Sequence, residues 1–140
     1  MKYIFLTKQF YEDFANCTEI EQKIFRPYAH LKITIDGVDF AVPLRSHINH
    51  PHVHWTDKNN CCGLDFSKTV VITTSDYINT TETPYLRPNE FRALKGKDFI
   101  IKEKLKKYIE KYKTAKADLT IPRNKTLYTY STLKYFEEYL

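Results

Sequence analysis

Residues 28–44 read YAHLKITIDGVDFAVPL, and this stretch carries the clearest structural signal in the chain. Its first half alternates apolar and polar residues, as a strand with one buried face does. The apolar ones are Leu31, Ile33 and Ile35. The Asp36-Gly37 pair that follows favours the tight turn of a β-hairpin. We therefore expect two antiparallel strands, at about 28–35 and 38–44.

The chain on either side of the hairpin predicts further strands and several helices. Proline lacks the N–H that strand pairing uses, so Pro43 should end the regular pairing. Two more strands are expected, at about 2–7 and 69–74. Capping residues predict helices that begin at Thr7, Thr18 and Ser131, and a proline predicts another that begins at Pro88. Apolar spacing predicts the longest helix, at 96–117. Early strands and late helices indicate an α+β fold in which helices surround a compact, twisted antiparallel or barrel-like sheet.

The composition fits one folded domain, residues 1–140, in the cytoplasm. A chain of 140 residues is long enough for one core. The three cysteines, Cys17, Cys61 and Cys62, are an odd number and two are adjacent, so we expect no disulfide framework and a reducing compartment. The apolar run near the amino terminus spans three residues, which is too short for a signal peptide or a membrane span.

Positive charge is concentrated in one segment. The chain carries a net charge of +5, and residues 97–116 alone hold eight lysines against three acidic residues. Such a concentration favours a polyanionic partner such as RNA, and a solvated helix face has the same composition. The lysines of this segment that are candidate RNA contacts are Lys102, Lys104, Lys106, Lys107, Lys111 and Lys113.

Histidines crowd into the stretch that follows the hairpin. Residues 43–55 read PLRSHINHPHVHW and hold four of the five histidines of the chain. In an extended strand, His50, His52 and His54 would share one face, as three ligands of a zinc or iron site could. Ligands so close together in one strand hardly reach tetrahedral geometry, so we expect no metal and no other cofactor.

The same stretch suits cleavage of RNA. RNA carries its own nucleophile, the 2′-hydroxyl, and an enzyme must move two protons and stabilise the charged intermediate. Histidine exchanges protons near neutral pH, arginine binds phosphate oxygens, and serine or asparagine adds neutral hydrogen bonds. Arg45, Ser46, His47, Asn49 and His50 supply these groups. Arg26 and Tyr28 precede the first hairpin strand, so antiparallel pairing brings them close to Arg45 and Ser46.

Four segments of the chain resemble a known family. They are KIFRPYAHLKI, FAVPLRSHINH, GLDFSKTVVI and the terminal LKYFEEYL. Together they resemble the toxins of type III toxin–antitoxin systems, the ToxN/AbiQ superfamily, and among these the TenpN-like branch. The likeness runs over nearly the whole chain, and its best markers are the P-L-x-S turn and the G-L-D-[FY]-S-K segment.

The resemblance implies a fold, an activity and a partner. Such toxins are metal-independent endoribonucleases with a twisted antiparallel core similar to that of MazF and Kid, wrapped by helices. They leave a 2′,3′-cyclic phosphate and a 5′-hydroxyl. A repeated pseudoknot RNA, which the toxin processes, holds them inactive in closed protein–RNA complexes, and several systems act in phage defence.

The resemblance also implies roles for individual residues. The active-site serine of the family falls on Ser46, and its basic residue before the first hairpin strand falls on Arg26. The family often has threonine or serine where Arg45 stands, and it often has a lysine shortly after the serine, where this chain has histidines and Asn49. We therefore expect His50 to act as acid or base. The remaining candidates are Tyr28 in the active site and Lys68 and His52 as RNA contacts.

Two other function classes stay open at this point. A non-catalytic RNA-binding module would use the same basic surface and would tolerate loss of Ser46 and His50. A metal-dependent hydrolase would instead use the row of His50, His52 and His54.

Overall fold

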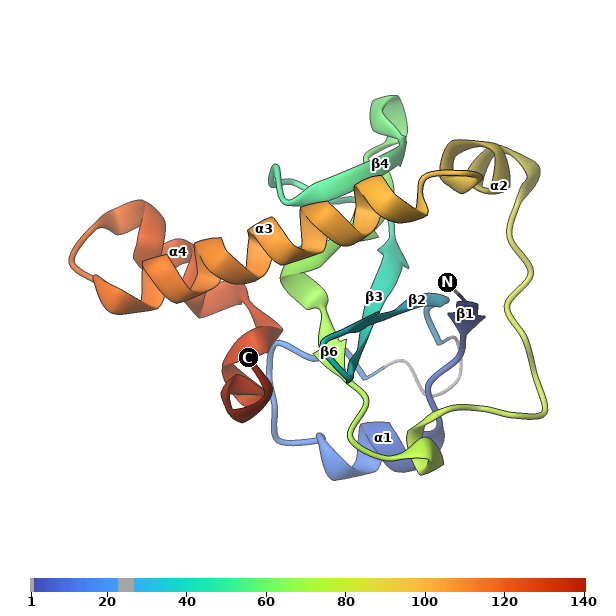
Figure 1. Cartoon of the computed structure of the whole chain (residues 1–140), viewed down its shortest axis with the longest axis horizontal. Helices are drawn as coiled ribbons and strands as arrows, with labels where there is room; N and C mark the ends of the chain where they lie inside the picture. The colour runs from blue at the N-terminus through green and yellow to red at the C-terminus, as the bar shows by residue number, and fades with distance from the viewer. Residues whose placement is uncertain (1, 23–26) are drawn as a thin grey trace.

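The computed structural model describes residues 2–22 and 27–140, and six strands of this part form one antiparallel sheet (Figure 1). In chain order the strands are β1 (Lys2–Ile4), β2 (His30–Ile35), β3 (Val38–Arg45), β4 (Val53–Asp57), β5 (Cys62–Asp65) and β6 (Val70–Val71). Their order across the sheet is β1-β2-β3-β5-β4, and β6 pairs with β3 alone. No pairing among the described strands joins β1 to β4, so the sheet is open and not a closed barrel.

The predicted hairpin is confirmed and forms the centre of the sheet. Strands β2 and β3 pair in register from Ile35 opposite Val38 to His30 opposite Pro43. Asp36 and Gly37 both have positive φ, at 50° and 79°, which is the backbone that a tight hairpin turn requires. The alternating apolar residues of β2 are buried in the main core.

Pro43 does not end the strand, contrary to the prediction. Strand β3 continues to Arg45, and its far side is paired first with β6 and then with β5. Leu44 donates its N–H to Ala29 on the β2 side, so the neighbouring Pro43 has its missing N–H on the other side. On that other side, the pairing with β6 ends at Ala41 and the pairing with β5 begins at Leu44. Pro43 lies between the two, so its missing N–H removes no hydrogen bond of the sheet.

In residues 2–22 and 27–140, four α-helices accompany the sheet: α1 (Lys8–Asp13), α2 (Pro88–Leu94), α3 (Asp98–Ala117) and α4 (Pro122–Tyr130). Thr7 caps α1 and Pro88 begins α2, as predicted. The long helix α3 runs from α2 to α4, against which it packs (Figure 1). Its predicted apolar face is buried: Ile101, Leu105, Tyr108, Ile109 and Tyr112. No helix in residues 2–22 or 27–140 has the length and apolarity that crossing a bilayer requires.

Two predicted helices differ from the structure. Thr18 donates its hydroxyl to Glu19 in a turn, so the predicted helix does not begin there, and part of its span lies outside the described residues. The terminal segment forms two 3-10 turns instead of one α-helix. Ser131 does cap the first of these turns, through its bond from the N–H of Leu133. The helix α4 was not predicted, and the three cysteines are free.

Strands β4 and β5 were not predicted from the sequence. They pair from Val53 opposite Asp65 to Asp57 opposite Cys62, with a bulge between Trp55 and Asp57. The two strands approach so closely at Gly63 that a Cβ added there would lie 2.4 Å from the His54 carbonyl oxygen and 2.9 Å from Trp55 Cα. This contact requires glycine at position 63.

Gly63→Ala should therefore push β4 away from β5 and lower the free energy of unfolding by about 2–3 kcal/mol. Gly37→Ala is the matched control, because no atom lies within 4 Å of its added Cβ. Its strain comes from positive φ alone and should cost about 1 kcal/mol. Urea unfolding of both variants measures the two effects. Equal losses would contradict a steric requirement at Gly63.

Candidate functional site

A buried carboxylate, Asp65, lies at the centre of the candidate site. Its side chain has no exposed surface and stands where β5 ends. Its Oδ2 accepts a hydrogen bond from Arg45 Nη1 at 2.5 Å. Its Oδ1 accepts from the Ser67 hydroxyl at 2.6 Å and from the Ser67 N–H at 2.9 Å, and lies 3.1 Å from His50 Nε2. Asp65 thus joins a residue of strand β3 to the loop that precedes β4.

The Asp65 carboxyl is ionised despite its burial. Burial acts to raise the pKa of Asp65, but hydrogen bonds from His50, Ser67 and Arg45 together lower it below its ordinary value. The negative charge is therefore stabilised by surrounding donors, as a buried charge requires. A carboxylate held in this way fixes the orientation of Arg45 and His50.

The geometry of His50 sets its tautomer. Its Nδ1 accepts the backbone N–H of His52 at 3.1 Å, so the proton of the neutral ring is on Nε2. Nε2 faces Asp65 and lies 3.1 Å from the Ser67 hydroxyl. Both ring nitrogens of His50 therefore have partners: Nδ1 accepts a backbone N–H, and Nε2 faces the buried Asp65 carboxylate.

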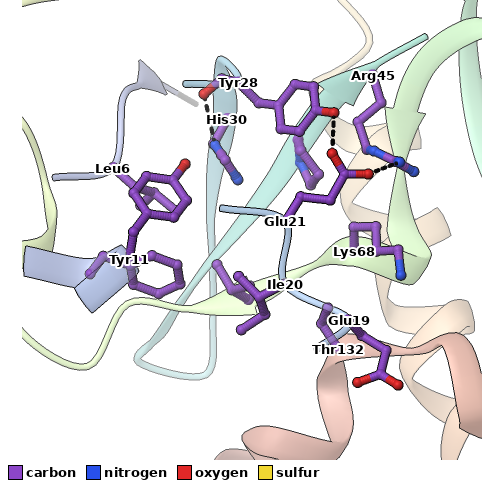
Figure 2. Close-up of a pocket in the computed structure, with 13 residues that line it drawn as sticks. Leu6, Tyr11, Glu19, Ile20, Glu21, Tyr28, His30, Arg45, Lys68 and Thr132 are labelled. Carbon is purple, nitrogen blue, oxygen red and sulfur yellow. Dashed lines mark hydrogen bonds and ion pairs between the residues drawn. The ribbon is translucent and has the colours of Figure 1, made fainter. Parts of the chain in front are cut away.

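Arg45 connects Asp65 to a second carboxylate. Its Nη2 donates to Glu21 Oε1 at 2.7 Å, and Tyr28 donates its hydroxyl to Glu21 Oε2 at 2.6 Å. Figure 2 shows Glu21 between these two donors. The Arg45 guanidinium also lies 5.8 Å from the centre of the Tyr28 ring. The antiparallel hairpin thus brings Tyr28 and Arg45 together, as predicted.

A small pocket, about 30 Å³ in volume, opens beside Arg45 (Figure 2). His30 lines it but donates Nδ1–H to the Tyr28 carbonyl, at 3.0 Å. Burial lowers the pKa of His30 to about 4, so this histidine stays neutral at physiological pH. Lys68 lines the pocket as well and donates to the Tyr130 carbonyl at 2.9 Å.

A larger groove, about 830 Å³ in volume, lies between α3, α4 and the loop before β4. Its lining includes His52, Lys106, Lys107, Lys111 and Arg123. The His52 ring lies 5.6 Å from the His50 ring and 5.4 Å from the Tyr108 ring, so the groove reaches the Asp65 network. Burial and the charges of His50 and Lys111 lower the pKa of His52. Four cationic side chains make this groove suitable for a polyanion.

The other predicted site residues lie around this network or away from it. Ser46, His47 and Asn49 are exposed in the loop after β3, and His47 has positive φ. Arg26 lies outside the described residues. Lys102 lines a different surface depression with Lys2 and Lys32, while Lys113 lies within 3.6 Å of Glu110. Only part of the predicted lysine set therefore lines the groove.

The histidine row does not converge. His54 is buried, and its Nδ1 accepts from Lys104 Nζ at 2.9 Å, whereas His50 faces Asp65 and His52 faces Tyr108. In the described ranges, no group of three or more His, Cys, Asp or Glu side chains is placed to hold a metal ion.

Sequence reasoning did not predict four residues of the site: Glu21, Asp65, Ser67 and Arg123. Asp65-x-Ser67 was a detectable signal, because aspartate two residues before serine often caps a turn through its side chain. The nearest predicted strand began only after this motif, so nothing placed Asp65 opposite β3. Comparison with protein-family models, curated proteins and solved structures found no match to this chain.

Proposed function

We propose that this chain is a metal-independent endoribonuclease, the toxin of a type III toxin–antitoxin system. One observation carries the proposal: buried Asp65 joins Arg45 and His50 beside a groove lined by Lys107, Lys111 and Arg123. An arginine and a histidine near a basic groove are among the groups that phosphodiester cleavage needs. The resemblance in sequence supports the same activity.

In the proposed reaction, the 2′-oxygen of a nucleotide attacks the adjacent phosphorus while the bond to the 5′-oxygen breaks. The 2′-hydroxyl loses its proton and the leaving 5′-oxygen gains one, which gives a 2′,3′-cyclic phosphate and a 5′-hydroxyl. In this proposal His50 acts as acid or base, for which one of its ring nitrogens exchanges its present partner, the His52 N–H or Asp65, for a reacting oxygen. Arg45 stabilises the charge that develops on the phosphate, and exposed Ser46 orients the substrate.

The basic groove gives the proposed antitoxin a place to bind. A folded pseudoknot RNA presents closely spaced phosphates, and Lys107, Lys111 and Arg123 can each neutralise one. We propose that this RNA and the toxin form a closed complex in the cytoplasm, and that the freed toxin cuts cellular or phage RNA. The open antiparallel sheet would then be a variant of the MazF and Kid core.

End analysis of cleaved RNA tests the activity. In EDTA, the purified protein should yield cyclic phosphate and 5′-hydroxyl ends, and Ser46→Ala and His50→Gln should each lower the rate by about 100-fold. Ser75→Ala, at another exposed serine, is the matched control. Binding without cleavage would indicate an RNA-binding module. Cleavage that EDTA abolishes would indicate a metal-dependent hydrolase.

A further inference from the structure

We infer that the carboxylate of Glu21 is an internal substitute for a phosphate group. It occupies an anion site formed by Arg45 Nη2 and the Tyr28 hydroxyl, at 2.7 and 2.6 Å from its two oxygens (Figure 2). A phosphate of RNA enters this site by displacing Glu21. The inference deepens the proposed function, and its identification of RNA as the source of the phosphate rests on that function.

The two donors have the geometry that a phosphate needs. Each contacts a different oxygen of the carboxylate, so a second anion with two free oxygens can form the same pair of bonds. Arg45 does not depend on Glu21 for its position, because Nη1 is bound to buried Asp65. When Glu21 leaves, Nη2 therefore stays directed into the site.

Two residues that line the pocket have buried donor atoms without a partner among the described residues. Tyr11 lines the pocket and is 3% exposed, and its hydroxyl has no hydrogen-bond partner among the described residues. Arg45 Nε is buried as well and is unpaired in the same part of the chain. Buried donors without partners are uncommon, since each costs free energy unless a ligand binds it. The pocket lining therefore has hydrogen-bonding capacity that Glu21 does not use.

Glu21 can leave while its neighbours stay in place. Its side chain is 42% exposed, so its ion pair with Arg45 contributes little to stability. Glu19, two residues earlier, is held by Lys134 at 2.9 Å and by the Tyr135 hydroxyl, and Ile20 is buried in the core. A side-chain rotation of Glu21 toward solvent therefore opens the site without moving the segment.

The test compares Glu21→Gln with Glu82→Gln. Glu82 is exposed, so its variant controls for the loss of one negative charge from a basic protein. The probes are inorganic phosphate and an oligonucleotide whose 2′-hydroxyls are replaced by hydrogen, which binds without being cut. Relative to Glu82→Gln, Glu21→Gln should lower the Kd for the oligonucleotide about two- to fivefold, as loss of a competing ion pair at a partly exposed site predicts. In NMR spectra of Glu21→Gln, inorganic phosphate should shift the Arg45 guanidinium N–H signal at a lower concentration than in spectra of Glu82→Gln.

Each outcome decides the inference. Equal affinities of Glu21→Gln and Glu82→Gln for both probes would overturn it. A gain for the oligonucleotide alone would support a site for phosphodiesters, and a gain for both probes would support a site for phosphate in general. A protein that gains affinity in this way but never cuts RNA would disprove the proposed function and leave the anion site intact.

Discussion

Asp65→Ala is expected to lower the free energy of unfolding by about 3–5 kcal/mol and to abolish RNA cleavage. The loss is large because Asp65 is fully buried and accepts hydrogen bonds from Arg45 and Ser67. His50 Nε2 also lies 3.1 Å from its Oδ1. Without the carboxylate, the mostly buried Arg45 guanidinium loses its buried charged partner and keeps the partly exposed Glu21. Two measurements check this expectation: urea unfolding, and single-turnover cleavage at a temperature where the variant is folded.

Two further variants sharpen this prediction. Asp65→Asn keeps the shape of the side chain but not its charge, so it should retain more stability than Asp65→Ala while cleavage stays strongly reduced. Asp76→Ala removes an exposed aspartate and should change the free energy of unfolding by less than about 0.5 kcal/mol. A loss below about 1 kcal/mol for Asp65→Ala would show that the network contributes little to the fold.

The sequence predicted those parts of the fold that depend on local signals. The 36–37 turn, the cap at Thr7 and the apolar face of α3 follow from neighbouring residues, and each is confirmed. Pro43 was interpreted wrongly because its effect depends on which strands lie beside β3, a long-range property. Strands β4 and β5 were missed for the same reason, since they are short and their pairing with each other and with β3 is long-range.

The site was predicted in the same partial way. Pairing within one hairpin was enough to bring Tyr28 to Arg45, and the chemistry of histidine was enough to single out His50. Asp65 and Glu21 reach Arg45 from segments 20 and 24 positions away, and no periodicity in the sequence links them. The lysines of α3 were expected to act as one surface. A helix distributes its side chains over all faces, so only some of them reach the groove.

Arg45→Lys should lower the rate of RNA cleavage by about 1000-fold while the protein stays folded. Arginine reaches Asp65 with Nη1 and Glu21 with Nη2 at the same time. A lysine ammonium keeps the charge but is a single point, so it neutralises Asp65 and leaves the anion site without its planar donor. Arg92→Lys, at an exposed position on α2, is the matched control, and a rate for Arg45→Lys within tenfold of the unaltered protein would contradict the role of the fork.

Combining Arg45→Lys with Glu21→Gln separates the two functions of this arginine. If Glu21 competes with phosphate for Nη2, removing its charge can help binding only while Nη2 is present. The gain in oligonucleotide affinity from Glu21→Gln should therefore disappear in the Arg45→Lys background, which a double-mutant cycle measures as a coupling. A gain that persists there would mean that Glu21 repels RNA through its charge alone. Cleavage in the double variant should stay as low as in Arg45→Lys, because the missing fork, and not the blocked site, then limits the reaction.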